Sequence, residues 1–139
     1  RIGDADKWRD RIDTVRQHGL EGLLDTVVAG WFGPSFAERD PEALRAIETA
    51  FTSTDPVGYV GCCAALRDAD LRDRVGRITA PTLLVAGSLD ASTPVADAEF
   101  LHERIPNSSL AVIQDAGHLA CLDRPEDFTR AVMEAWAEW

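Results

Sequence analysis

Two residues in the second half of the sequence, Asp90 and His118, could carry proton-transfer chemistry. Asp90 lies shortly after the apolar run TLLVAG, and His118 lies shortly after a second apolar run, SLAVIQ. A histidine is the natural general base near neutral pH, and a carboxylate is a common partner for it. Each residue also has a simpler interpretation, Asp90 as a loop residue that caps the next helix and His118 as an ordinary loop histidine.

The two apolar runs are predicted to be neighbouring strands of a parallel sheet. Both are apolar on both faces, which is typical of strands buried between helices. The segment between them, starting at Thr93-Pro94, predicts a helix, and such strand–helix–strand units join parallel strands. Ligands of open α/β sheets bind beyond the carboxyl ends of the strands. Asp90 and His118 would therefore share one edge of the sheet, which favours a joint role.

The first part of the chain predicts helices only. An apolar stripe at helical spacing covers Leu20 to Trp31, and Asp40-Pro41 and Asp55-Pro56 each place a capping carboxylate before a proline, a common helix start. We therefore expect a helical segment over residues 1–78 and a strand-helix-strand-helix segment over residues 79–139.

The last helix is expected to begin after Asp123-Arg124-Pro125. Its expected apolar side consists of Phe128, Val132, Ala135, Trp136 and Trp139. Two strands alone leave both outer edges of a sheet unpaired, and most sheets hold about four to six strands. The rest of this sheet is therefore expected to lie outside these residues.

Composition excludes several classes of function. The net charge of -10 disfavours nucleic acids and anionic membranes, which require a basic surface. No apolar run approaches the about 18 residues that span a bilayer, and the N-terminus is too charged for a signal peptide, so we expect a soluble, cytoplasmic protein. The three cysteines form no C-x-x-C pair, and no metal site is expected.

The segments GSLDASTP and DAGHLACLDRPEDF closely resemble the acid and histidine segments of the α/β-hydrolase fold. That family has the chain order nucleophile, acid, histidine. The resemblance implies that Asp90 orients the imidazole of His118, which takes the proton of the nucleophile. The G-x-S-x-G elbow of the nucleophile is absent from these residues. The resemblance thus implies the C-terminal part of such a fold, whose partner is an N-terminal portion carrying the serine, and a chain that is inactive by itself.

The helical segment resembles the cap, or lid, of bacterial 3-oxoadipate enol-lactonases, hydrolases of the β-ketoadipate pathway of aromatic degradation. The resemblance lies in RIGDADKW, AGWFGPSF and GYVGCCAALRDAD. It implies hydrolysis of the lactone ester of 3-oxoadipate enol-lactone without a metal or organic cofactor.

The implied substrate carries a carboxylate, and Arg67 is the cap cation that could bind it. The alternative is an exposed arginine at a helix end, paired with Asp68 or Asp70. Trp31 could form an apolar wall of the pocket, or it could simply pack in the core of the cap.

Two other functions remain open at this point. Another lid-bearing α/β hydrolase, such as a carboxylesterase or a cofactor-free haloperoxidase, could use the same acid and histidine. A helical module without catalytic activity could instead bind a partner through the open edge of the sheet. A second chain with an elbow serine that completes the sheet favours an enzyme, whereas a dimer closing its own sheet favours the binding module.

Overall fold

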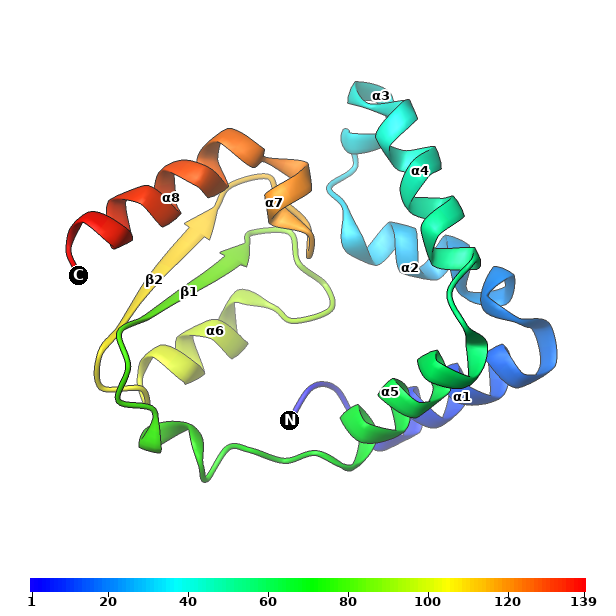
Figure 1. Ribbon diagram of the computed structural model, residues 1–139, viewed down its shortest axis with the longest axis horizontal. Helices are drawn as coiled ribbons and strands as arrows, with labels where there is room; N and C mark the ends of the chain where they lie inside the picture. The colour runs from blue at the N-terminus through cyan, green and yellow to red at the C-terminus, as the bar shows by residue number, and fades with distance from the viewer. The chain divides into compact units, whose positions relative to one another are not determined.

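The chain folds into helices and one small parallel sheet, drawn in Figure 1. The computed structural model describes residues 1–139. None of the helices is both long and apolar enough to cross a membrane. In chain order the elements are α1 (Ala5–His18), the 3₁₀ turn η1 (Leu20–Leu23), α2 (Leu24–Trp31), α3 (Phe36–Arg39), α4 (Pro41–Thr52), α5 (Pro56–Asp68), the 3₁₀ turn η2 (Val75–Arg77), β1 (Thr82–Gly87), α6 (Val95–His102), β2 (Ser108–Ile113), α7 (Ala120–Asp123) and α8 (Pro125–Ala137).

The chain divides into two compact units. The first unit consists of Arg1–Ala29 and Pro34–Asp70, and the second consists of Gly30–Gly33 and Leu71–Trp139. The division expected from the sequence lies between residues 78 and 79, whereas the structure groups residues 30–33 and 71–78 with the strands. The short segment 30–33 is therefore part of the same unit as Asp90 and His118.

The first unit is helical throughout. Asp40 and Asp55 each accept a hydrogen bond, 2.9 Å long, from a backbone N–H in the first turn of the helix that they precede. This geometry confirms the two helix starts predicted at these residues. Apolar side chains from α1 to α5 are buried, namely Ile12, Val15, Leu20, Leu23, Val27, Phe36, Phe51 and Cys63. The stripe from Leu20 to Trp31 begins as a 3₁₀ turn and continues as α2, rather than forming one helix.

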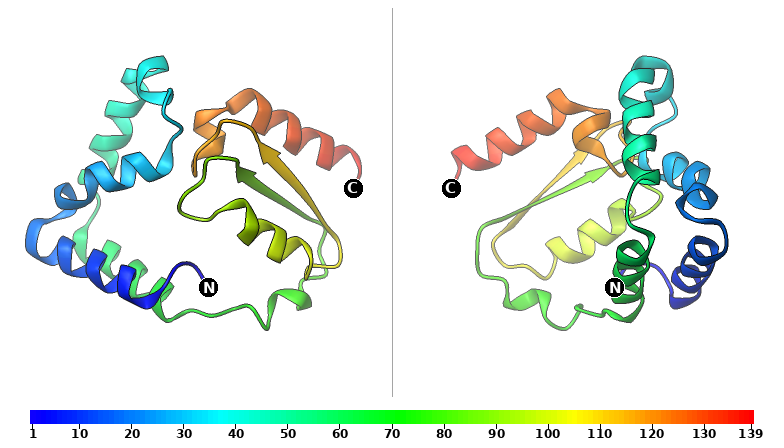
Figure 2. Two further views of the ribbon diagram at one scale, coloured as in Figure 1. Left: turned by 180° about the vertical axis from the view of Figure 1, so that it is seen from behind. Right: turned by 45° about the vertical axis from the view of Figure 1, so that its right-hand side comes forward.

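The second unit contains the predicted strand–helix–strand–helix. β1 and β2 pair in parallel, with Thr82 opposite Ser108 and Gly87 opposite Ile113. Helices α6 and α8 pack on the strands from opposite sides in every view of Figures 1 and 2. The α/β class and the order of elements are thereby confirmed. β2 covers Ser108–Ile113, one residue earlier than the run SLAVIQ suggests.

A small buried cluster lies beneath the end of β2. Ile113, Ala116 and Ala120 are almost completely buried, and Val85, Phe128 and Ala131 pack against them. Ala116 has no exposed surface at all, so the loop after β2 packs against this core through Ala116.

The apolar side expected for the last helix is wrong in part. Ala135 is buried, but Trp136 and Trp139 keep 72% and 59% of their surface exposed. Helical spacing places Trp136 on the same side as Phe128 and Val132, whereas Trp139 lies beyond the end of α8 at Ala137. Within these residues, Ala135 is buried on α8 while Trp136 is not.

Candidate active site

The loops after β1 and β2 are joined to one another by hydrogen bonds. The N–H of Ser88 donates to the carbonyl of Ile113, and the N–H of Leu89 donates to that of Ala116, both at 2.9 Å. The hydroxyl of Ser88 accepts a further bond from the N–H of Asp115 at 2.9 Å. Hydrogen bonding between the two chain segments thus continues past the strands, so that Asp90 and His118 lie close together beyond their carboxyl ends.

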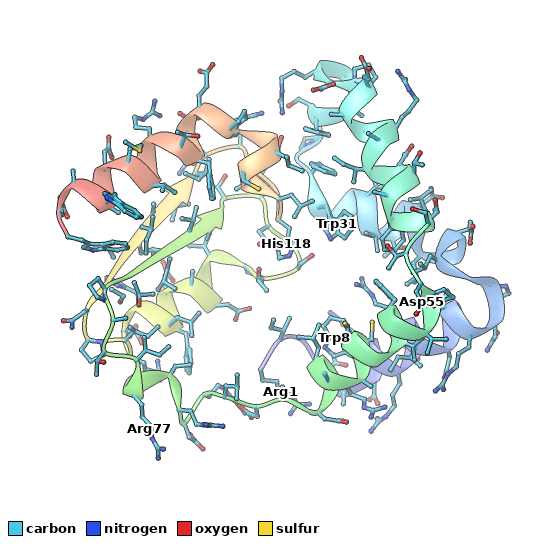
Figure 3. All side chains as sticks on the ribbon, viewed as in Figure 1. Arg1, Trp8, Trp31, Asp55, Arg77 and His118 are labelled. Atoms are coloured by element: carbon cyan, nitrogen blue, oxygen red, sulfur yellow. The ribbon has the colours of Figure 1, made fainter.

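Asp90 and His118 are in direct contact at the carboxyl ends of the strands. Nδ1 of His118 lies 2.9 Å from Oδ2 of Asp90. The Asp90 side chain is only 4% exposed, while that of His118 is 34% exposed and is labelled in Figure 3. A buried carboxylate thus contacts an imidazole that is partly exposed within these residues.

Asp90 is held by more than the histidine. Its Oδ1 accepts hydrogen bonds from the N–H groups of Ser92 (2.8 Å) and Thr93 (2.9 Å), and its Oδ2 accepts one from the Thr93 hydroxyl (2.8 Å). Burial raises the pKa of Asp90, but the bonds from Thr93, His118 and Ser92 lower it further than burial raises it. The pKa of Asp90 therefore lies below its ordinary value, and the group is an anion at neutral pH.

The ionised state of Asp90 determines the tautomer of His118. An ionised carboxylate only accepts hydrogen bonds, so Nδ1 of the ring must carry the proton that points at Asp90. In the neutral ring Nε2 then has a free lone pair and can accept a proton. This arrangement suits a general base whose protonated form is stabilised by Asp90.

The helix expected to start at Thr93-Pro94 is present, but Thr93 is not its cap residue. The cap position of α6 is Pro94, and the helix begins at Val95. The Thr93 hydroxyl instead donates to Asp90, and its oxygen lies 3.2 Å from Nδ1 of His118. No sequence signal separates this role from capping, because a threonine before a proline is also a common cap. Asp90 does not cap α6: one of its oxygens accepts hydrogen bonds from the turn before that helix, and the other contacts His118.

We expect Thr93→Val to weaken the protein's stability above pH 4. Asp90 has a lowered pKa in the folded state, so its stabilising effect is present above the unfolded pKa and is lost as the pH falls through the folded value. Removing the hydroxyl donor raises the folded pKa and should reduce this effect by about 1 kcal/mol.

The measurement is urea unfolding of the wild type and the variant between pH 2 and pH 6. Thr93→Ser keeps a hydroxyl at the same position and serves as the control. Equal pH dependence in the valine and serine variants would contradict the role given to the Thr93 hydroxyl.

Trp31 lies beside the histidine loop. Its carbonyl accepts a hydrogen bond of 2.9 Å from the N–H of Leu119, the residue that follows His118, and Trp31 and His118 are both labelled in Figure 3. The Trp31 side chain is half-buried at the end of α2. The structure thus brings Trp31 to the site through its backbone, while contact of its ring with a substrate stays a prediction.

Arg67 lies in the other unit, near the end of α5. Its Nε and Nη2 donate to the two oxygens of Asp68, at 2.8 and 2.9 Å, and its side chain is 30% exposed. One of the pairings considered for Arg67 is therefore present. Binding of a substrate carboxylate by Arg67 stays a prediction.

No group of three or more His, Cys, Asp or Glu side chains is placed to hold a metal ion. The chemistry that these residues can perform is proton transfer between His118 and a hydroxyl group or water. Asp90 would stabilise the resulting charge.

Comparison with known proteins identifies the family. The family described as "alpha/beta hydrolase fold" matches residues 15–125. The chain belongs to the α/β-hydrolase family. 3-Oxoadipate enol-lactonase 2 of Acinetobacter baylyi is 38% identical over 132 residues, which are 95% of this chain and 49% of that protein. A pimeloyl-[acyl-carrier protein] methyl ester esterase of Chromobacterium violaceum is 34% identical, over 88% of this chain and 46% of that protein.

The structural likeness is equally extensive. The crystal structure of the enol-lactonase from Burkholderia xenovorans superimposes with a TM-score of 0.94 and 31% sequence identity, covering 99% of this chain and 52% of that one. The chain thus spans about half the length of the relatives that it matches. Its two-stranded sheet and helices are those of the C-terminal part of an α/β-hydrolase fold, as the acid and histidine segments indicated.

Proposed function

We propose that this chain provides the cap, the triad acid Asp90 and the triad histidine His118 of an enzyme that hydrolyses 3-oxoadipate enol-lactone to 3-oxoadipate. The observation that carries the proposal is the 2.9 Å contact between Nδ1 of His118 and Oδ2 of the buried Asp90. The choice of substrate is supported by the likeness to two enol-lactonases along nearly the whole chain.

The nucleophile of the proposed reaction is a serine in a G-x-S-x-G elbow. No such elbow occurs in these residues, so the serine lies in the remainder of the hydrolase. Nε2 of His118 takes the proton of the serine hydroxyl as the oxygen attacks the lactone carbonyl carbon. The ring C–O bond breaks, and the leaving enol oxygen receives that proton from the imidazolium. Water then attacks the acyl-enzyme, His118 takes its proton, and the proton returns to the serine as the acid is released.

Asp90 and Thr93 support both halves of this reaction. Each half creates an imidazolium for a short time, and the anionic Asp90 lies 2.9 Å from its Nδ1. The Thr93 hydroxyl donates a hydrogen bond to Oδ2 of Asp90 and would hold this oxygen beside His118 in both halves of the reaction.

The partner in this proposal is the nucleophile-bearing remainder of the hydrolase, either in the same protein or in a second polypeptide. Without it we expect no turnover from this chain. Native mass spectrometry of the purified protein tests for a second polypeptide, and sequencing of the bound chain tests for an elbow serine. If only this chain is found, folded as a dimer whose two copies complete one sheet, the enzyme proposal is contradicted. That result would favour a non-catalytic binding module.

The substrate is tested with the complete enzyme. We expect kcat/KM for the enol-lactone to exceed that for pimeloyl methyl ester and for p-nitrophenyl acetate by at least about 100-fold, because binding of the whole substrate stabilises the transition state. A preference for simple esters would instead support a general carboxylesterase. Halogenation activity would support a cofactor-free haloperoxidase.

A cytoplasmic location stays a prediction from the sequence.

We expect Arg67→Gln to raise KM for the enol-lactone about tenfold, because one charge-assisted hydrogen bond to the substrate carboxylate is lost. The neutral ester p-nitrophenyl acetate should show no such change. Asp68→Asn is the matched control, since it breaks the Arg67–Asp68 pair and keeps the arginine. Equal KM values for wild type and Arg67→Gln would leave Arg67 as a helix-end residue only.

A further inference from the structure

Asp123 is a buried carboxylate that the proposed reaction does not use. It is the last residue of α7, and its side chain has no exposed surface. A buried charge is costly unless hydrogen bonds satisfy it. Its Oδ2 accepts hydrogen bonds from the N–H of Gly33 at 2.7 Å and from the N–H of Gly117 at 2.8 Å. One carboxylate oxygen thus connects the residue before His118 to a segment far away in the sequence.

That segment, residues 30–33, is called the strap here. The strap follows α2 and belongs to the same unit as the strands. The carbonyl of Trp31 accepts from the N–H of Leu119, and a Cβ atom on Gly117 would lie 2.7 Å from the backbone of Phe32. The strap therefore lies directly against the backbone on both sides of His118.

The loop that carries His118 is also closed on itself. The N–H of Asp123 donates to the carbonyl of Leu119 at 3.0 Å, and the carboxylate of Asp123 accepts from Gly117. The N–H of Gly117, one residue before His118, is anchored by Asp123, and the peptide group after His118 is anchored by the strap through the N–H of Leu119. These two bonds hold the backbone on either side of the histidine.

We propose that Asp123 is a positioning residue that holds His118 at hydrogen-bonding distance from Asp90 by anchoring Gly117 to the strap. This inference rests on the proposed function, since it assigns a role within the same site. Asp123 acts through the backbone: its Oδ2 accepts from two N–H groups, while its Oδ1 lies 3.5 Å from Nη1 of Arg124. Its removal leaves those two buried N–H groups without this acceptor, and the loop must rearrange to satisfy them.

The test compares Asp123→Ala and Asp123→Asn in the complete enzyme. The asparagine keeps a side-chain oxygen that can accept from Gly33 and Gly117, whereas alanine keeps none. We expect Asp123→Ala to lower kcat about 10- to 100-fold, because small displacements of a catalytic group reduce turnover strongly, with KM changed less than about twofold. Asp123→Asn should recover kcat to within about fivefold of the wild type.

A purely structural role would reduce the amount of folded enzyme and leave kcat per active site unchanged. Active sites are therefore counted by titration with a fluorophosphonate that labels the nucleophile. Ile105→Val is the matched control, since Ile105 is buried in the same unit and the change removes one methylene group. If kcat per active site is the same in Asp123→Ala as in Ile105→Val, the positioning role is refuted.

A second readout does not depend on activity. Nδ1–H of His118, held by Asp90, should give a slowly exchanging downfield proton signal in the NMR spectrum of the wild type, absent from His118→Gln. We expect this signal to be lost in Asp123→Ala and retained in Asp123→Asn. If the wild type hydrolyses no ester or lactone, the proposed function fails, and the NMR signal still decides for or against the positioning role.

Discussion

His118→Gln in the complete enzyme is expected to lower kcat by about 10⁴-fold or more, since it removes the general base of the triad. Glutamine is close in size to histidine but has no nitrogen that can take a proton near neutral pH. The Nδ1 contact with Asp90 and the Nε2 base are lost together. The measurement is steady-state hydrolysis of the enol-lactone, with circular dichroism to confirm that the variant is folded.

His102→Gln is the matched control for this prediction. His102 ends α6 in the same unit, is exposed, and has its Nδ1 2.9 Å from the hydroxyl of Ser108. We expect it to leave kcat within about twofold, because it lies at the opposite end of the strands from the site. Similar losses in both histidine variants would contradict the assignment of His118 as the base.

Gly87→Ala is expected to have the largest effect on stability among the single substitutions considered. Gly87 ends β1 and is buried. A Cβ atom there would lie 2.2 Å from the carbonyl oxygen of Gly117 and 2.4 Å from that of Ala116. Both are backbone atoms of the histidine loop and cannot turn away as a flexible side chain would. We expect the free energy of unfolding to fall by about 3 kcal/mol.

Activity should fall with stability in this variant, because the atoms that must move lie directly before His118. Urea unfolding followed by circular dichroism measures the first effect, and kcat/KM of the folded enzyme measures the second. Gly61→Ala provides the contrast: Gly61 is inside α5 with open space around its Cβ position, so alanine should stabilise the protein by about 0.5 to 1 kcal/mol. Equal unfolding midpoints for the two variants would contradict the close approach at Gly87.

The apolar runs TLLVAG and SLAVIQ were sufficient to predict both strands, their parallel pairing and the edge at which Asp90 and His118 lie. This follows from local physics, since strands buried on both faces are apolar throughout and their crossover has one hand. Helix starts at Asp40 and Asp55 were predictable for the same reason, because a cap acts within one turn.

The roles of Thr93 and Asp123 could not be predicted from the sequence. Thr93 precedes a proline and resembles a helix cap, yet its hydroxyl donates to Asp90. Asp123 precedes a helix that starts with proline, yet its carboxylate turns inward to Gly33 and Gly117. The competing roles use the same residue types. Only the position of the partner distinguishes them, which is the Asp90 carboxylate for Thr93 and the N–H groups of Gly33 and Gly117 for Asp123.

The sequence by itself determined the order strand-helix-strand-helix of the second half and the placement of an acid and a histidine at one edge of a parallel sheet. Its acid and histidine segments also indicated the family. Only the tertiary structure decided that Asp90 contacts Nδ1 of His118 at 2.9 Å and that a buried Asp123 anchors the histidine loop to residues 30–33. The physical reason is range. Periodicity and capping act within a few residues, whereas the bond from Gly33 to Asp123 joins residues 90 positions apart, and chain folding alone brings them together.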